Sequence, residues 1–342
     1  MSKPTMRALL LESYQSAQFR DVQIERPAPG QGEVLVRVIA SGVNPIDYKI
    51  RTGIASYAMP ELPAVLGTDM AGIVESVGAG VTTFKPGDAV YGMTGGVRGL
   101  QGSLAHYQVA DADLLAHKPK NLSFREAAAV PLTFLTAWQG LVDGAKLKQG
   151  QSVLIQGGAG GVGHMAVQIA RSLGANVFAT ASQAKHSLVE QLGAVPIDYH
   201  SSTVEQYISR HTQARGFEVI FDSAGGKSLD DSLAAIAPYG HIASCAAFGT
   251  HNLATSSLRC ATLTGVFVLL PMLSGQGRAH QGQVLANATR LIEKGEVRPI
   301  LDKHRFTLSE AHQAHDLVQS GQAVGKVVIE VASEADQWLG AD

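Results

Sequence analysis

The feature that most constrains the fold of this chain is a regular alternation of short apolar segments and amphipathic segments that begins at Gln151. Six apolar runs are predicted to be strands: Ser152–Gln156, Asn176–Thr180, Val195–Asp198, Phe217–Asp222, His241–Ala246 and Leu263–Leu270. Segments with helical periodicity separate the first five: Gly163–Leu173, Lys185–Leu192, Thr203–His211 and Ser228–Ile236. Strands joined through helices run parallel, and right-handed crossovers cover both faces of their sheet. The alternation therefore predicts an α/β domain built on a doubly wound parallel sheet.

The first 124 residues have a different character, because short β-rich runs alternate there with turns. Turn chemistry such as Pro29-Gly30 and Pro86-Gly87 separates the runs. The predicted strands are Arg7–Glu12, Glu33–Ser41, Asp69–Val77, Asp88–Tyr91 and Ser103–Val109. This pattern predicts a compact and mainly antiparallel β domain.

The two patterns meet near Phe124, where Ser123 and Glu126 have the spacing of a capping box at a helix start. Beyond the last predicted strand of the parallel sheet, Ser274–Gly282 is expected to be a mobile loop. The elements expected after it are helices over Gln281–Lys294 and Leu308–Ser320 and a strand over Lys326–Val331. We expect them to fold back onto the β domain. The predicted domains are residues 1–124 with 272–342, and residues 125–271.

Composition excludes several classes of protein. The chain has 342 residues and a formal net charge of −2, and no run of Lys and Arg favours nucleic acid or an anionic membrane. The longest apolar stretch, around Leu263–Leu273, is shorter than the ~20 residues of a membrane span. Two cysteines, Cys245 and Cys260, do not make a disulfide framework. We therefore expect a soluble protein of the cytoplasm without a secretory signal.

A glycine-rich turn follows the first predicted strand of the parallel sheet. Gly158, Gly160 and Gly163 have the spacing G-x-G-x-x-G, and a predicted helix follows them. Glycine is needed where backbone approaches a pyrophosphate, and the free N–H groups at a helix start hold the phosphate charge. We therefore predict that Gly160, Gly161 and Val162 bind a dinucleotide. The alternative is a purely structural turn.

The end of the second strand indicates which dinucleotide. Enzymes that use NAD usually place Asp or Glu there to bind the ribose hydroxyls, whereas Ala179–His186 contains no carboxylate. Ser182 can donate to a 2′-phosphate, and Lys185 can neutralise it. These residues favour NADPH. The alternative is that Lys185 is simply a solvated residue at a helix start.

The glycine-rich turn and several further motifs resemble those of a known family, and the resemblance covers nearly the whole chain. The chain resembles the zinc-free members of the medium-chain dehydrogenase/reductase superfamily, close to the quinone oxidoreductase and zeta-crystallin group. The matching segments are Ser41–Asp47, Leu66–Gly72, Val77–Val81, Leu135–Ala137, Ala159–Gly163 and Phe221–Gly225. The resemblance implies a GroES-like β-barrel domain beside a Rossmann domain, with the active site between them. It also implies a homodimer formed through the outermost strand, here Leu263–Leu270, which would otherwise be an exposed apolar edge.

The chain departs from the zinc-dependent relatives at the metal ligands. Those enzymes place Cys where this chain has Asn44, and Gly-His-Glu where it has Gly67-Thr68-Asp69. They also carry four closely spaced Cys in a lobe, whereas Gly92–Gly102 contains none. Zinc requires thiolate and imidazole ligands, so we predict that the chain binds no metal.

The resemblance also implies roles for individual residues. Asn44 would lie near the nicotinamide and offer an amide donor to the substrate carbonyl. The other residues implied in cofactor binding are Thr136 at the nicotinamide, Tyr199 at the adenine, and Ser223, Phe248 and Gly249 along the cofactor path. Tyr57 is the candidate proton donor, because related enoyl reductases use a tyrosine in that region. Alternatively, Tyr57 is only packed in place with its hydroxyl at the rim of the cleft, and solvent supplies the proton.

Without a Lewis acid, the chemistry suits a substrate that conjugation has already made electrophilic. We therefore expect an NADPH-dependent oxidoreductase that transfers hydride to a quinone or an α,β-unsaturated carbonyl compound. Two alternatives remain open. One is an enoyl-thioester reductase of lipid metabolism, and the other is a non-catalytic NADPH-binding protein.

Overall fold

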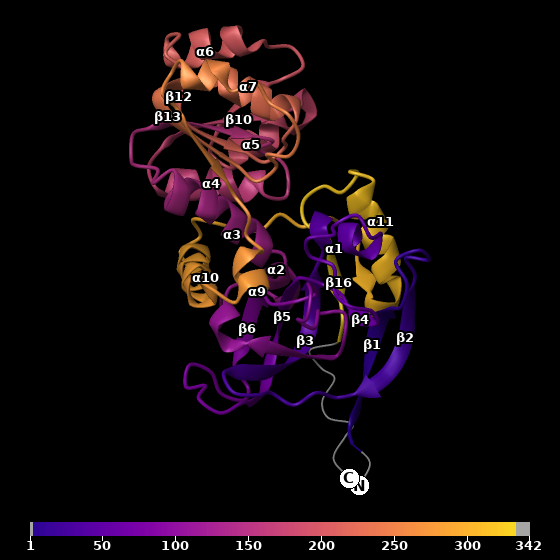
Figure 1. Ribbon diagram of the computed structural model, residues 1–342. Helices are drawn as coiled ribbons and strands as arrows, with labels where there is room; N and C mark the ends of the chain where they lie inside the picture. Colours follow the sequence, from indigo (N-terminus) through magenta and orange to yellow (C-terminus); the bar gives the residue numbers. More distant parts are fainter. Residues whose placement is uncertain (1–2, 333–342) are drawn as a thin grey trace. The chain divides into compact units, whose positions relative to one another are not determined.

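The computed structural model describes residues 3–332 and divides them into two compact units (Figure 1). The described parts of residues 1–132, 269–293 and 299–342 form the first unit. Residues 133–268 and 294–298 form the second. The N-terminal β-rich segment and the C-terminal segment therefore share a unit, and the strand–helix alternation lies in the other.

The second unit contains the predicted six-stranded parallel sheet. Its strands are β9 (Ser152–Gln156), β10 (Asn176–Ala181), β11 (Val195–Asp198), β12 (Phe217–Asp222), β13 (Ile236–Ser244) and β14 (Thr262–Gly265). They lie in the order β11-β10-β9-β12-β13-β14, and every neighbouring pair is parallel. This is the strand order of the Rossmann fold, in which the chain reverses direction across the sheet after β11. The prediction of a doubly wound α/β domain is confirmed.

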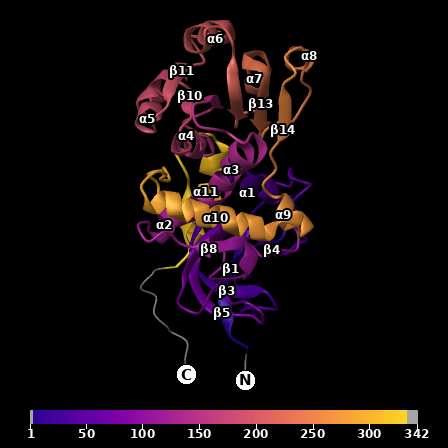
Figure 2. The same cartoon turned by 90° about the vertical axis from the view of Figure 1, so that its left-hand side faces the viewer.

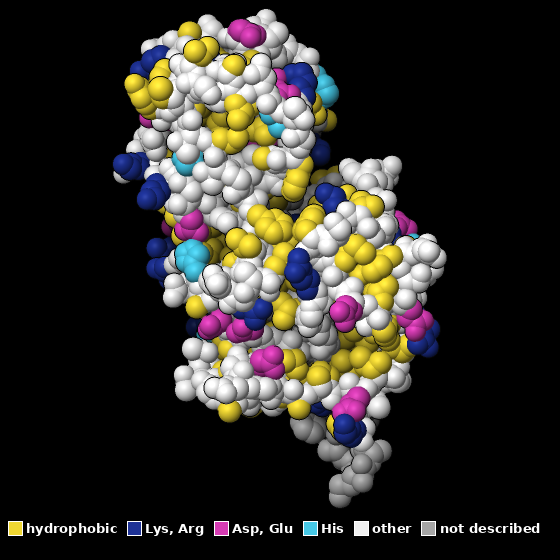
Figure 3. All heavy atoms as spheres, viewed as in Figure 1, with side chains coloured by type: hydrophobic (Ala, Val, Ile, Leu, Met, Phe, Trp, Pro, Cys, Tyr) yellow, Lys and Arg dark blue, Asp and Glu magenta, His cyan; other side chains and the backbone are white. Residues whose placement is uncertain are grey.

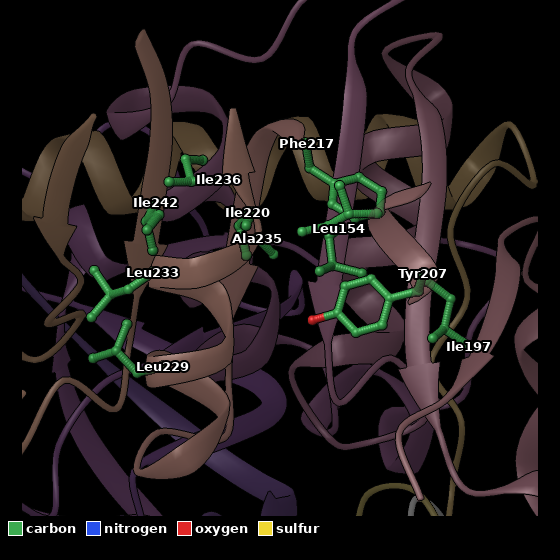
Figure 4. Close-up of a cluster of buried hydrophobic side chains, with 11 residues drawn as sticks. Leu154, Ile197, Tyr207, Phe217, Ile220, Leu229, Leu233, Ala235, Ile236 and Ile242 are labelled. Carbon is green, nitrogen blue, oxygen red and sulfur yellow. The ribbon is translucent and has the colours of Figure 1, made fainter. Parts of the chain in front are cut away.

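Helices cover both faces of this sheet, as the predicted crossovers require. The connecting helices are α4 (Gly163–Ser172), η3 with α5 (Gln183–Lys185 and His186–Gln191), α6 (Val204–Thr212) and α7 (Lys227–Ala235). Tyr207 of α6 and Leu229 of α7 pack with Phe217 and other strand residues in one buried cluster (Figure 4). Helix α4 lies on the other face, against β9 and β10 (Figure 1).

The first unit is built on two sheets that are mainly antiparallel. The three-stranded sheet has the order β2-β1-β4, and the larger sheet has the order β15-β16-β3-β5-β6-β8, with β7 paired to β3. The strands are β1 (Thr5–Leu11), β2 (Phe19–Glu25), β3 (Glu33–Gly42), β4 (Ala64–Val65), β5 (Asp69–Val77), β6 (Ala89–Met93), β7 (Tyr107–Asp111), β8 (Leu115–His117), β15 (Phe306–Thr307) and β16 (Val328–Glu330). An antiparallel bridge between Ala8 and Ala105 links the two sheets.

Short helices complete the first unit and connect it to the second. They are α1 (Pro45–Arg51), η1 (Ala112–Leu114), α2 (Phe124–Ala128), α9 (Leu270–Ser274), α10 (Arg278–Glu293), η4 (Leu308–Glu310) and α11 (Ala311–Gln319). The capping box of Ser123 and Glu126 is present at the start of α2, as predicted. The chain enters the second unit through α3 (Pro131–Trp138) and the π-helical turn η2 (Gln139–Gly144). Within that unit, α8 (Ala254–Ser257) lies between β13 and β14. Figure 2 shows α10 lying beside β8, a packing that the contacts between the two elements confirm.

Two sequence-based expectations are wrong in detail. The last strand of the parallel sheet ends at Gly265 instead of Leu270, because its partner β13 ends at Ser244 and the chain then turns into α9. The segment Ser274–Gly282, expected to be a mobile loop, is mostly helical, since α10 already begins at Arg278. Among residues 3–332, no helix is long and apolar enough to cross a membrane. Charged side chains of both signs are scattered over the face drawn in Figure 3.

Candidate functional site

The glycine turn between β9 and α4 has no room for side chains. A Cβ atom added to Gly163 would lie 2.0 Å from the carbonyl oxygen of Gly157, and one added to Gly158 would lie 2.5 Å from Cβ of Ala179 on β10. Gly157 itself has a φ of +75°, which favours glycine. These close approaches press the start of α4 against the strands. They are the local reason for glycine at Gly158 and Gly163.

The same turn presents unused backbone donors. The N–H of Gly160 donates to the carbonyl of Gly157 over 2.9 Å, whereas within residues 3–332 we find no backbone acceptor for the N–H groups of Gly161, Val162 or Gly163. Helix α4 has 10 residues, so its N-terminus carries a partial positive charge toward the same place. Free amides at a helix N-terminus fit the pyrophosphate of a dinucleotide. The chain's own geometry therefore accommodates the predicted cofactor.

The remaining residues predicted to bind cofactor follow the carboxyl ends of the neighbouring strands. The pairs Gln156–Asp222, Asp222–Ser244 and Ala181–Asp198 are in register, so strands β9 to β13 end along one edge of the sheet. Directly beyond those ends lie Ser182, Tyr199 and Ser223, and Phe248 and Gly249 lie on the loop that follows the end of β13. The structure brings these five to one edge together with the glycine turn. Thr136, which is buried, lies on α3.

The accessibility of these residues differs. Tyr199 and Phe248 are 54% and 67% exposed, and Lys185 is also exposed, as expected for residues that contact a ligand at a surface. Ser223 donates its hydroxyl proton to the carbonyl of Gln156 over 2.7 Å, so its oxygen remains available only as an acceptor. Tyr199 lines a cavity of about 450 Å³ that Lys227 also borders. Tyr199, which is predicted to lie at the adenine, therefore borders a cavity at this edge of the sheet.

A polar network beneath that edge escaped the sequence analysis. Thr180 donates to the side-chain oxygen of Gln156 over 2.9 Å and accepts from the N–H of Gly157 over 2.9 Å. Asp222, fully buried at the end of β12, accepts from Ser228 and Ser244 over 2.9 and 2.7 Å and from the N–H of Gly225 over 3.0 Å. These side chains hold the loops after β9 and β12. The sequence feature that could have indicated this network is the presence of charged or polar residues at the ends of apolar strands.

The first unit holds a second polar cluster, centred on Asn44. Asn44 is fully buried at the turn between β3 and α1. Its amide nitrogen donates to Asp69 over 2.8 Å and to Thr68 over 3.0 Å, and its side-chain oxygen accepts from the ammonium of Lys326. Both amide hydrogens are therefore engaged within the protein. An additional hydrogen bond from Asn44 to a substrate carbonyl would require one of these two bonds to break.

Two buried carboxyl groups flank Asn44. Asp47 accepts from the backbone N–H of Asn44 over 2.7 Å and from that of Thr68 over 3.0 Å. Asp69 accepts from Asn44 and from the backbone N–H of Leu132, over 2.8 and 3.1 Å. Burial raises the pKa of Asp47 to about 6 and that of Asp69 to about 7, because loss of water penalises the charged form more than these hydrogen bonds and Lys326 favour it.

Lys326 is the member of this cluster that sequence reasoning missed. It immediately precedes β16, is 4% exposed, and also donates to the carbonyl of Val43 over 2.8 Å. The residue lies 282 positions from Asn44 in the chain. Nothing in the local sequence distinguishes it from a solvated lysine at the start of a strand.

Tyr57, the predicted proton donor, lies on the loop between α1 and β4 and is 38% exposed. The guanidinium of Arg98 fixes that loop by donating to the carbonyl of Tyr57 over 3.1 and 3.2 Å. Partial burial raises the pKa of the Tyr57 phenol. The group therefore keeps its proton at neutral pH, which a general acid must do. Among residues 3–332, no group of three or more His, Cys, Asp and Glu side chains is arranged to hold a metal ion.

Comparison with known proteins assigns the family. Residues 30–120 match the family model described as "Alcohol dehydrogenase GroES-like domain", and residues 192–329 match the one described as "Zinc-binding dehydrogenase". The chain is 34% identical over 312 residues to the "NADPH-dependent alkenal/one oxidoreductase, chloroplastic" of Arabidopsis thaliana, covering 89% of this chain and 73% of that protein. The chain belongs to the medium-chain dehydrogenase/reductase superfamily. Within it, the chain falls in the quinone oxidoreductase and alkenal reductase-like group.

Solved structures agree with that assignment. An alcohol dehydrogenase superfamily protein from Novosphingobium aromaticivorans has 46% identity and a TM-score of 0.93, and the match covers 96% of this chain and 100% of that one. The quinone oxidoreductase from Coxiella burnetii has 29% identity and a TM-score of 0.80, over 96% of this chain and 100% of that one. The chain also matches 13% of the length of the "Spectinabilin polyketide synthase system protein NorB" of Streptomyces orinoci, at 36% identity over 88% of the chain. The first unit of this medium-chain reductase is thus GroES-like, and the second is a Rossmann domain.

Proposed function

We propose that this medium-chain reductase uses NADPH to reduce quinones or α,β-unsaturated carbonyl compounds, and that it does so without a metal. The coarser statement, that it is an NAD(P)H oxidoreductase of the quinone and alkenal reductase type, already follows from its family. The observation that carries the proposal is the carboxyl edge of the Rossmann sheet. There a glycine turn with free amides lies beside a second strand that ends without a carboxylate.

The choice of NADPH rests on the residues after β10. Ser182 is half-buried at the end of that strand, and Lys185 is exposed one short 3-10 turn later. A carboxylate at this place would bind ribose hydroxyls and repel a 2′-phosphate, whereas a hydroxyl and an ammonium would hold the phosphate. Tyr199 flanks the neighbouring cavity, which supports its predicted place beside the adenine.

NADPH, when bound, supplies the hydride, and the chain must supply the position of the substrate and a proton. Tyr57 is our candidate donor of that proton, since its phenol stays protonated at neutral pH. In this proposal, Asn44 stays in its buried hydrogen-bond network, and its fixed amide shapes the turn between β3 and α1. Its neighbours Thr68 and Asp69 are likewise engaged in hydrogen bonds and are poor zinc ligands as a set, which supports metal-free chemistry.

A second candidate function is the reduction of an enoyl thioester. The match to a segment of a polyketide synthase protein favours it, because such assemblies handle acyl thioesters. Activity toward crotonyl thioesters above that toward free enones and quinones would decide for this alternative. Binding of NADPH with no turnover of any of these compounds would instead indicate a non-catalytic protein.

The test measures oxidation of NADPH and, in parallel, NADH against a panel of quinones, alkenals, enones and a crotonyl thioester. In Lys185→Glu we expect the KM for NADPH to rise by about tenfold or more, with the KM for NADH unchanged. Lys148→Glu makes the same charge change at an exposed position before β9, at the opposite edge of the sheet, and serves as the control. Equal use of NADH by the wild type would contradict the role given to Ser182 and Lys185.

Two further proposals concern the compartment and the oligomeric state of the protein. Both cysteines are free thiols, which supports a reducing compartment such as the cytoplasm. The outer edge of β14 carries Leu263, 38% exposed, and unpaired strand edges of this kind favour pairing with another chain. We therefore propose a homodimer joined through β14.

A further inference from the structure

Lys326 is held in place more firmly than a surface lysine. Its backbone N–H donates to Ile300 over 2.7 Å, and its carbonyl accepts from the N–H of Asp302 over 2.9 Å. Gly325 before it has a φ of +86°, and a Cβ atom there would lie 2.5 Å from the carbonyl oxygen of Ile300. The main chain therefore directs this side chain inward, where lysine is rarely found unless it is paired.

The ammonium of Lys326 has no direct carboxylate partner within 4.0 Å in the part of the chain that the structure describes. It donates instead to the side-chain oxygen of Asn44 and to the carbonyl of Val43. The amide of Asn44 then continues the connection, because its nitrogen donates to Asp69. A neutral amide thus lies between a buried cation and a buried anion.

This arrangement permits only one orientation of the Asn44 amide. Turned by 180°, the amide would direct its NH₂ group at the ammonium and its oxygen at the carboxylate of Asp69. The contact with the ammonium would be repulsive, and so would the contact with Asp69 when its carboxyl group is ionised; burial removes the water that would screen them. Lys326 and Asp69 together therefore fix the direction of the amide dipole.

Three ionisable groups face Asn44. They are Asp47 from α1, Asp69 from β5 and Lys326 from the segment before β16. Two carboxylates and one ammonium would leave one net negative charge if all were ionised. Burial lowers the pKa of Lys326, and the charges of Asp69 and Asp47 oppose that change. Lys326 is the one cation that stabilises the two carboxylates within this set.

We propose that Lys326 is a positioning residue of the reductase: its ammonium fixes the Asn44 amide and the turn between β3 and α1 in the geometry that the reduction requires. The inference rests on the proposed function, since it assigns Lys326 to the substrate end of that reaction. Lys326 acts through Asn44 and not on the substrate. Its loss should therefore slow turnover while leaving the binding of NADPH to the glycine turn unaffected.

Another buried cation, at the end of α1, provides the matched control. Arg51, at the far end of α1, is 2% exposed and donates directly to Asp316 over 2.6 Å. It holds α1 against α11 and has no part in the Asn44 network. Arg51→Met removes a buried positive charge of the same unit without touching Asn44, so it reports the effect of lost stability alone.

The experiment is a double-mutant cycle of Lys326→Met and Asn44→Ala, with kcat, KM and the dissociation constant of NADPH measured for each variant. We expect Lys326→Met to lower kcat by about 100-fold, because misplacement by 1 Å can cost that much. The dissociation constant of NADPH should change by less than about threefold. The double variant should be no slower than Asn44→Ala alone, since one residue acts through the other. Arg51→Met should keep its kcat within about threefold of the wild type.

A charge-balanced variant keeps the proposal falsifiable if Lys326→Met does not fold. Asp69→Asn with Lys326→Met removes one charge of each sign, and we expect it to fold and to remain slow. Recovery of wild-type kcat in that variant would overturn the proposal, because Lys326 would then be only a counter-charge. Independent, multiplicative effects in the cycle would overturn it as well. A wild type inactive toward every quinone, enone and thioester would instead contradict the proposed function.

Discussion

The substitution Gly163→Ala tests the glycine turn most directly. The added Cβ would lie 2.0 Å from the carbonyl oxygen of Gly157 and 2.9 Å from Cα of Gly158, whereas real Cβ contacts essentially never fall below 3.0 Å. All the obstructing atoms are backbone, so the turn must open by about 1 Å. Such overpacking destabilises by about 1–3 kcal/mol. The same movement displaces the amides of Gly161 and Val162 from the place of the pyrophosphate.

The expected loss of cofactor binding follows from those amides. Two hydrogen bonds to a charged group contribute about 1.5–3 kcal/mol each, so the dissociation constant of NADPH should rise by about 100-fold or more. Fluorescence titration with NADPH measures the affinity, and thermal unfolding measures the stability. Gly99→Ala, on the exposed loop between β6 and β7, places its Cβ in open space and should change neither quantity. Gly163→Ala with NADPH affinity within about threefold of wild type would refute the assignment of this turn.

Three further predictions concern other parts of the molecule. Burial raises the pKa of Asp47 to about 6 and of Asp69 to about 7 from 3.8, so the native state binds more protons than the unfolded state between about pH 4 and 7. The free energy of unfolding should therefore fall as the pH rises through that window. Denaturant titrations at several pH values measure this fall, which should be smaller in Asp69→Asn than in the wild type. Tyr91→Phe removes a buried hydroxyl that donates to the carbonyl of Leu285 over 2.8 Å, which should cost about 1 kcal/mol in chemical denaturation, whereas Tyr239→Phe, at 83% exposure, should cost nothing measurable. Leu263→Lys places a charge on the edge strand β14 and should shift the protein to monomer in sedimentation velocity, and an unchanged oligomer would argue against pairing through β14.

The parallel sheet could be predicted because each of its strands is visible in its own residues. Strands covered on both faces become continuous apolar runs, as in Val153–Ile155 of β9, where all three side chains are fully buried. Strand β2 was missed for the opposite reason. Four of its seven residues are charged or polar, it lies at the edge of a sheet, and no residue in it is fully buried.

The length of β14 illustrates a limit of hydrophobic patterns. The apolar run continues past Gly265 through Val268 and Leu269, and these two side chains are indeed buried. They are buried without strand pairing, because β13 has ended and the next helix, α9, begins at Leu270. An apolar run reports burial and does not report which backbone hydrogen bonds accompany it.

One part of the candidate site could likewise be predicted from the sequence, and another part could not. The placement of the glycine turn, Ser182, Tyr199 and Ser223 at one edge could be predicted, because each lies immediately after a strand that the sequence reveals and parallel strands end at one edge. Their binding of a cofactor stays a prediction. The Asn44 cluster was not, because its members come from β3, α1, β5 and the segment before β16. Comparison of motifs could say that Asn44 and Thr68 lack the chemistry of zinc ligands. It could not say what those side chains bind instead.

The Asn44 cluster also shows why a buried amide is suited to its place. An aspartate at position 44 would pair directly with Lys326 but would bring a third carboxylate against Asp47 and Asp69, with one ammonium to offset three negative charges. A leucine would leave the ammonium of Lys326 with only the carbonyl of Val43 and the side chain of Asp69 with only the backbone N–H of Leu132, and it would remove the amide that connects the two groups. Asparagine accepts at one end and donates at the other, so it connects the two charges without adding one. The identity of residue 44 is thus determined by a lysine 282 positions away, which no reading of the surrounding segment could have supplied.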